Sequence, residues 1–105
     1  MKLFNKLNKA DQKGFIKYYN EFDVNLQDVQ SLDDFLADQG FELDPNPYGP
    51  EWTYEYEDND DEVMIDYSDD VDKWRIYYDN YTDTNCDAIY KYFNSIGELI
   101  EYMRQ

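Results

Sequence analysis

The chain lacks histidine entirely and has a single cysteine, Cys86, among its 105 residues. No intrachain disulfide can form, and zinc sites built from histidine and cysteine are excluded. The sequence also has no glycine-rich phosphate loop, no histidine base and no nucleophile elbow, so we expect neither catalysis nor a cofactor. No continuous apolar stretch follows the basic first residues. Neither a signal peptide nor a membrane span is therefore predicted, and a cytoplasmic location is the expectation.

Basic residues are scarce as well, with nine lysines and arginines against 25 acidic residues and a formal net charge of −16. Five lysines lie in the first twenty residues beside a single acid, Asp11, which leaves the other 85 residues with four bases and 24 acids, or −20. A compact chain of this length is about 33 Å across, and duplex DNA of that length carries on the order of 20 phosphate charges. The acidic body therefore rivals duplex DNA in charge per length.

A high charge of one sign is typical of disordered chains, but aromatic residues make up 19% of this sequence, including twelve tyrosines and two tryptophans. Aromatic rings bury a large apolar area for each ordered residue, which a small folded domain needs. The length allows one domain with a modest core. We therefore predict a single folded domain, residues 1–105.

Two helices are predicted in the first half of the chain and one at its end. Apolar residues at helical spacing predict the first, from Ala10 to Phe22. Ser31 is the predicted cap of the second helix, and Gly40 ends it. Ser95 has glutamate three residues later, which is the capping-box spacing and predicts a C-terminal helix. The first helix or its extension carries a basic stripe of four lysines, Lys6, Lys9, Lys13 and Lys17. This stripe either docks on an acidic surface or only solubilises the helix.

The middle of the chain alternates between apolar and polar residues, as β-strands do. The alternation covers residues 52–57, 62–68 and 74–79, and a further strand is predicted over 88–93. A proline-rich stretch precedes these strands and acidic turns separate the first three, so the connections are short. Short connections favour an antiparallel meander. We therefore predict an α+β fold with about four antiparallel strands, helices packed on one face of the sheet, and the other face exposed to water.

Carboxylates fall on the predicted open face and in the turns beside it. Along one strand they are ~6.6 Å apart, and neighbouring strands are ~4.8 Å apart, a spacing that resembles a patch of phosphates to a basic groove. The alternative interpretation is a solvated face that only keeps the protein soluble. Five of the acids match EF-hand spacing, but Val63 stands where that loop needs glycine, so no specific metal site is predicted. The predicted partner-binding residues are Glu55, Glu57, Asp58, Asp60, Asp61, Glu62, Asp66, Asp69, Asp70, Asp72 and Asp79.

In size, charge and aromatic content, and in its acidic segment 55–72, the chain resembles the small acidic inhibitors encoded by phages and mobile elements. These include anti-CRISPR and anti-restriction proteins and uracil-DNA glycosylase inhibitors, several of which act as DNA mimics. The resemblance implies an inhibitor, monomeric or homodimeric, in the cytoplasm of a bacterial host. Such an inhibitor blocks the nucleic-acid-binding surface of a Cas effector, restriction enzyme or other nuclease and does not bind nucleic acid itself. The alternatives are an immunity protein for a basic toxin nuclease and an acidic regulatory or adaptor domain without mimicry.

Overall fold

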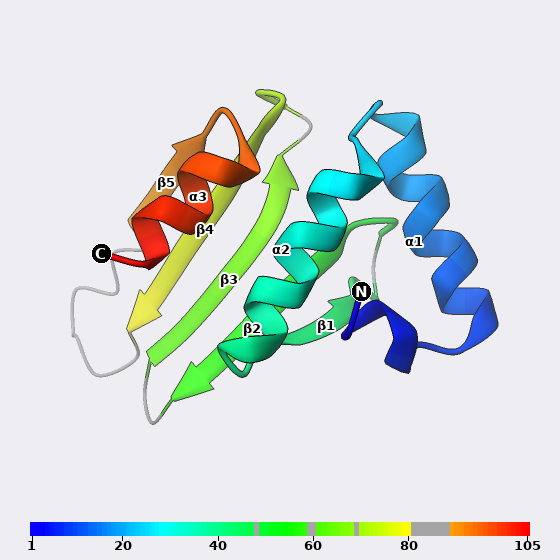
Figure 1. Ribbon diagram of the computed structural model, residues 1–105, viewed down its shortest axis with the longest axis horizontal. Coiled ribbons are helices and arrows are strands. Elements are labelled where there is room, and N and C mark those ends of the chain that lie inside the picture. The colour runs from blue at the N-terminus through cyan, green and yellow to red at the C-terminus, as the bar shows by residue number, and fades with distance from the viewer. Residues whose placement is uncertain (48, 59–60, 69, 81–88) are drawn as a thin grey trace.

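The computed structural model describes residues 1–47, 49–58, 61–68, 70–80 and 89–105, and the side chains of residues 58, 61, 79, 80 and 89 lie outside the described part. The chain has the predicted α+β architecture, with two N-terminal helices, an antiparallel five-stranded sheet and a C-terminal helix packed against it (Figure 1). In chain order the elements are the 3-10 turn η1 (Phe4–Lys6), α1 (Lys9–Glu21), α2 (Leu26–Asp38), β1 (Glu42–Pro45), β2 (Trp52–Asp58), β3 (Asp61–Ser68), β4 (Lys73–Asn80), β5 (Ile89–Phe93) and α3 (Ile96–Met103).

The strands lie side by side in the order of the sequence, β1-β2-β3-β4-β5, and each is antiparallel to its neighbour. This is the predicted meander, with one strand more than the four expected. The additional strand is β1, which lies just before and at the start of the proline-rich stretch and was not counted among the predicted strands. Leu43 pairs with Tyr54, and both side chains are buried. Pro45 cannot donate to a ladder, and it is tolerated because it is the last residue of an edge strand.

Of the two predicted helix caps, the one of the C-terminal helix is found in the structure and the one of the second helix is not. The predicted cap at Ser31 is wrong, because α2 begins earlier, where the side chain of Asn25 accepts a hydrogen bond from the N–H of Gln27. Ser31 lies inside the helix, and its hydroxyl donates to the carbonyl oxygen of Gln27. In α3 the predicted cap is confirmed: the Ser95 hydroxyl accepts from the N–H of Glu98 at 3.2 Å.

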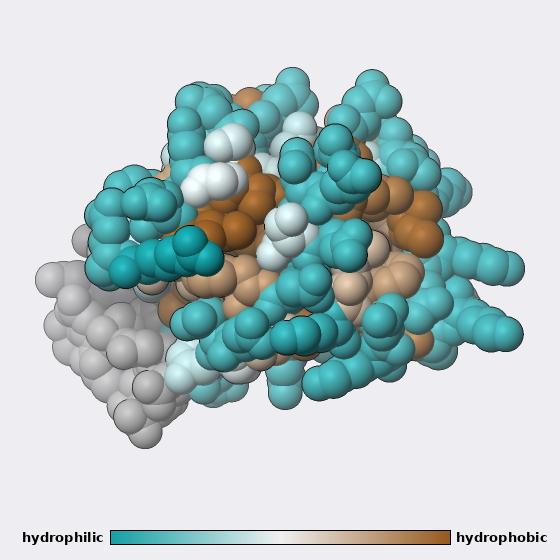
Figure 2. Space-filling view, in the orientation of Figure 1, coloured by the Kyte–Doolittle hydropathy of each residue, from teal (hydrophilic) through white to brown (hydrophobic). Residues whose placement is uncertain are grey.

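The core lies between one face of the sheet and the helices, all of which Figure 1 shows on the same side. Its contacts are largely aromatic. Phe15 meets Trp52 edge-on with ring centres 5.6 Å apart, and Tyr19 stacks on Trp74 at 5.9 Å, so α1 is fixed to β2 and β4. Seen from the helix side, the surface is mainly hydrophilic, with hydrophobic residues visible between the helices (Figure 2). The aromatic core supplies the apolar burial that opposes charge repulsion.

One carboxylate of α2 points into the protein. Asp33 is fully buried and accepts hydrogen bonds from the backbone N–H groups of Leu3 at 2.8 Å and Phe4 at 3.2 Å. It also accepts from the hydroxyl of Tyr54 at 3.0 Å. Burial raises the pKa of Asp33, and these hydrogen bonds oppose that effect. Asp33 therefore joins η1, α2 and β2, and its role is structural.

Candidate functional site: the open face of the sheet

One face of the sheet carries none of the described helices, and the register of the strands determines which side chains this face presents. Tyr54, Ile65 and Ile76 face the helices and are fully buried, so the residues next to them along each strand point to the other side. The described residues on the open face fall into two groups. We call the first, on β1, β2 and the adjoining end of β3, the acidic half. The second, on β4 and β5, consists of Arg75, Tyr77, Tyr90 and Tyr92, and we call it the tyrosine half.

The acidic half is a group of carboxylates gathered from three adjacent strands. Glu42 of β1 lies directly opposite Glu55 of β2, and Glu57 lies opposite Glu62 of β3. The sequence has no lysine or arginine between Lys17 and Lys73, so α2 and the first three strands contain no cation. Like charges directly opposite one another on a sheet are destabilising. The members of the acidic half are Glu42, Asp44, Glu55, Glu57 and Glu62.

Glu55 lies at the centre of this group and has a raised pKa. Its pKa is raised from 4.5 to about 6, chiefly because partial burial disfavours its charged form. The neighbouring Asp44 contributes next, both by repulsion and by a hydrogen bond, followed by repulsion from Glu62 and Glu42. Near neutral pH this carboxylate is ionised against an unfavourable environment. The ionised form of Glu55 therefore carries an unfavourable electrostatic free energy that a cation brought close to it would offset.

A hollow of about 210 Å³ opens at the edge of the acidic half. It lies where the pairing of β1 with β2, which covers residues 52–55 of β2, has ended, so that the next residues of β2 have no strand paired on that side in the described part of the chain. Carboxylates around an opening of this size suit a cationic side chain such as lysine or arginine from another molecule. The hollow is lined by Gly40, Glu42, Glu55, Tyr56, Glu57 and Glu62.

The tyrosine half has a single arginine at its centre. The guanidinium of Arg75 donates to both carboxylate oxygens of Asp66, at 2.9 Å and 2.6 Å. This pairing raises the pKa of Arg75 further above its already high value. The guanidinium also lies 5.4 Å from the ring centre of Tyr90, and that ring is 4.8 Å from the ring of Tyr77. Tyr90 and Tyr92 remain 51% and 46% exposed.

The predicted partner-binding residues are thus distributed over several places. Glu55, Glu57 and Glu62 lie together in the acidic half, whereas the carboxylate of Asp66 is already neutralised by the ion pair described above. Asp70 and Asp72 are exposed in the turn between β3 and β4, at the other end of β3. Three predicted side chains, Asp58, Asp61 and Asp79, and two whole residues, Asp60 and Asp69, lie outside the described part.

Two acids of the group, Glu42 and Asp44, were not among the predicted residues. They stand on either side of the buried Leu43, which is the alternation of a half-buried strand, and this signal was available in the sequence. The tyrosine half could not be found in the same way. Its residues come together only through the pairing of β4 with β5, which places Tyr77 opposite Tyr90 and Arg75 opposite Tyr92.

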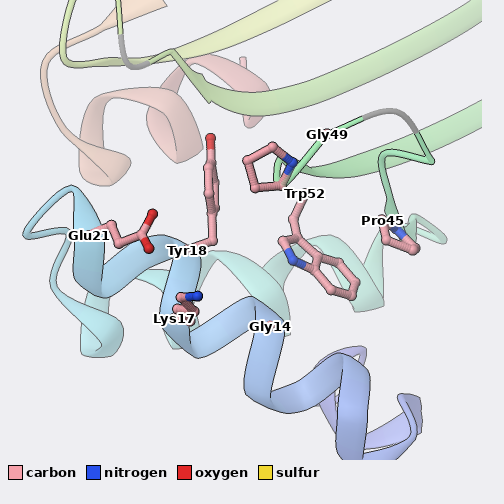
Figure 3. Close-up of a pocket in the computed structure, with 8 residues that line it drawn as sticks. Gly14, Lys17, Tyr18, Glu21, Pro45, Gly49 and Trp52 are labelled. Carbon is pink, nitrogen blue, oxygen red and sulfur yellow. The ribbon is translucent and has the colours of Figure 1, made fainter.

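A groove on the helix side is a further concave feature, and it offers no reactive group. It lies between α1 and the β1–β2 connection and has a volume of about 240 Å³. Figure 3 shows Tyr18 and Lys17 projecting from α1, with Trp52 on the opposite wall. Its lining includes a lysine and a glutamate one helical turn apart, but no nucleophile with an adjacent base. The lining residues are Gly14, Lys17, Tyr18, Glu21, Pro45, Gly49, Pro50 and Trp52.

Neither a metal site nor a membrane-spanning helix occurs in the described ranges. Within them no group of three or more acidic or cysteine side chains has the geometry to hold a metal ion. None of the described helices is long and apolar enough to cross a bilayer. The chain matches no protein-family model, and no curated protein and no solved structure is significantly similar to it. Any function must therefore be inferred from the geometry and charge of the open face.

Proposed function

We propose that this protein is a non-catalytic inhibitor that occupies the nucleic-acid-binding groove of a basic nuclease-type enzyme, as anti-CRISPR and anti-restriction DNA mimics do. The observation that carries the proposal is the acidic half of the open face. Five carboxylates from three strands lie there at sheet spacing, on a part of the chain without any cation. A partner that normally holds phosphates would find a comparable row of negative charge.

The cost of this arrangement supports a role in binding. A face that served solubility alone could intersperse lysines among its acids. The face would then stay hydrophilic without the repulsion between carboxylates. Here Glu55 is instead held with a pKa raised to about 6, first by partial burial and then by repulsion from acidic neighbours. A basic groove would turn this repulsion into attraction on binding, and the long-range field would accelerate association. The same field disfavours direct binding of nucleic acid by this protein.

An immunity protein that neutralises a basic toxin nuclease would need the same surface and is the second candidate. The two candidates differ in the partner and not in the mechanism. In both, the inhibitor and nucleic acid compete for one groove. An acidic adaptor without mimicry would show no such competition.

The test uses a panel of purified nucleases that includes a Cas effector with its guide, a restriction endonuclease and nuclease toxin domains. We expect the protein to bind at least one member with nanomolar to micromolar affinity and to be displaced by that member's nucleic acid. Binding should weaken as salt rises, because the screening length falls from ~10 Å at 0.1 M to ~3 Å at 1 M. Binding that persists unchanged in saturating nucleic acid would contradict mimicry. Binding of duplex DNA by this protein alone would contradict it equally.

A pair of charge-matched variants locates the contact. The first replaces three members of the acidic half, Glu42→Gln, Glu55→Gln and Glu57→Gln. The second removes three charges from exposed acids of the three helices, which lie on the opposite side of the sheet, with the substitutions Glu21→Gln, Asp28→Asn and Glu101→Gln. We expect at least a tenfold loss of affinity for the first and less than a threefold loss for the second. Equal losses would show that net charge alone matters.

A further inference from the structure

The tyrosine half of the open face exposes an unusual amount of aromatic surface. Tyr90 and Tyr92 are each about half exposed, whereas the other described aromatic side chains are buried or partly buried. Tyrosine and arginine are the residue types, with tryptophan, that most often carry the binding energy of protein interfaces. The described residues of these types on the open face are Arg75, Tyr77, Tyr90 and Tyr92, and Tyr90 and Tyr92 are the most exposed of them.

The tyrosine half is also pre-organised. Arg75 is fixed by two hydrogen bonds to Asp66, and it lies against the ring of Tyr90. Tyr90 in turn packs on Tyr77 at a ring-centre distance of 4.8 Å. Side chains that are already ordered lose little conformational freedom when a partner covers them, so more of the contact energy is available for binding.

The acidic half alone is too small for a stable interface. Three strands about 4.8 Å apart and about five residues long span roughly 240 Å² of projected area. A standard interface buries about 800 Å² of accessible surface on each partner. The five strands have 32 residues in all and span roughly 500 Å², which approaches that size once side-chain relief is added. A partner that covers the acidic half therefore has to extend over the neighbouring strands.

The two halves form one continuous surface. The strand register places Glu42, Glu55, Met64, Tyr77 and Tyr90 in a single row that crosses all five strands. A hollow of about 270 Å³ lies where the halves meet and can receive a side chain from the partner. It is lined by Thr53, Met64, Asp66, Arg75, Tyr77 and Tyr90.

We propose that the tyrosine half is the anchoring part of the interface with the same basic nucleic-acid-binding protein. This inference rests on the proposed function and adds a division of labour to it. The acidic half attracts and orients the partner, and therefore controls the association rate. The rings of Tyr90 and Tyr92 provide desolvated contact area, and therefore control how slowly the complex dissociates.

The experiment measures association and dissociation rates by surface-immobilised kinetics on the nuclease panel, at 50 mM and 300 mM salt. Four proteins are compared with the wild type. They are the acidic-half triple variant, Tyr90→Thr with Tyr92→Thr, Tyr90→Phe with Tyr92→Phe, and the control Ile16→Thr, which removes an exposed apolar side chain from α1. Threonine retains strand propensity at exposed positions, and circular dichroism with thermal unfolding verifies that each variant is folded.

We expect the threonine pair to dissociate at least tenfold faster at both salt concentrations, with association nearly unchanged. The phenylalanine pair, which keeps the rings, should dissociate within threefold of the wild type, as should the control. The acidic-half variant should associate more slowly, most clearly at 50 mM salt.

Each remaining outcome overturns one or both proposals. If the threonine pair binds like the wild type while the acidic-half variant fails, the anchor proposal is wrong and the proposed function stands. If the acidic-half variant binds normally, the proposed function is wrong whatever the tyrosine variants do. If the wild-type protein binds no member of the panel, both are overturned. A wild-type dimer that the threonine pair converts to a monomer, seen by sedimentation, would identify the tyrosine half as a self-contact and refute the anchor proposal.

Discussion

Glu55→Gln should stabilise the protein at neutral pH, and the size of the effect follows from the site. The pKa of Glu55 is raised from 4.5 to about 6 in the folded state. A raised folded-state pKa means that the protonated form is favoured by folding. Glu55 therefore contributes its full stabilisation below about pH 4.5 and loses it as the pH rises through about 6. Glutamine is a neutral isostere, so the variant retains at pH 7.5 what the wild type has only at low pH.

The difference between 4.5 and about 6 corresponds to roughly 2 kcal/mol of unfolding free energy. Glu55 is only partly buried, and water screens its interactions with neighbouring acids, so a gain of about 1 kcal/mol is the more realistic expectation. For a domain of this size, 1 kcal/mol raises Tm by about 4–8 °C. Burial is the first cause of the raised pKa and repulsion the second, so 1 M salt should remove part of the gain and leave the rest.

Thermal unfolding of the wild type and of Glu55→Gln, at pH 7.5 and at pH 4.5, measures this effect. The variant should melt several degrees higher at pH 7.5 and at the same temperature as the wild type at pH 4.5. Glu101→Gln, which removes one charge from an exposed position of α3, serves as the control and should change Tm by no more than a degree or two. A Glu55→Gln protein that is no more stable than the wild type at pH 7.5 would refute the assignment of Glu55 as a crowded, partly buried carboxylate.

Two further predictions concern the buried polar groups. Asp33→Asn should lower the unfolding free energy by about 3 kcal/mol in urea titrations, because an amide offers one acceptor oxygen to three donors. Tyr54→Phe removes one of these donors and should lower the unfolding free energy by about 1 kcal/mol. Equal effects of the two variants would show that the backbone donors of Leu3 and Phe4 do not depend on Asp33. The hydroxyl of Tyr19 is buried without a hydrogen-bond partner among the described residues, so Tyr19→Phe should raise the unfolding free energy by about 1 kcal/mol, and a destabilised variant would show that this hydroxyl is satisfied.

The arrangement of the sheet could be predicted because alternation and short connections leave few choices. Residues 52–57, 62–68 and 74–79 alternate without interruption, and each strand lies in the structure within a residue or two of the prediction. The edge strand β1 was harder because it has only four residues and ends at a proline. The error at Ser31 has another origin. Asparagine and serine can both cap a helix, and both Asn25 and Ser31 stand in this segment. The helix begins at Asn25, which places Val29 within it and in the core.

The candidate site could be predicted only in part, because charge patterning shows which face is acidic and not which charges cancel. Asp66 had the same predicted role as Glu55, yet the strand register pairs Asp66 with Arg75, whereas it places Glu55 between Glu42 and Met64. Asp33 is the opposite case. Its position four residues after Val29, on the apolar stripe of α2, was visible in the sequence, but its hydrogen-bond donors come from the distant N-terminal segment. Long-range donors of this kind are set by the tertiary fold.

The layered fold explains how the chain can tolerate so acidic a surface. In a strand, successive side chains point to opposite faces, so the residues that stabilise the sheet and the residues that face water can change independently. Trp52, Tyr54 and Ile65 bury apolar area against the helices, and the carboxylates between them are separated from that core by the thickness of the sheet. Repulsion on the open face therefore lowers the stability of the whole domain without disturbing its packing. A surface built this way keeps its shape when its charges are removed. Variants of the open face can therefore separate the effect of charge on binding from its effect on folding.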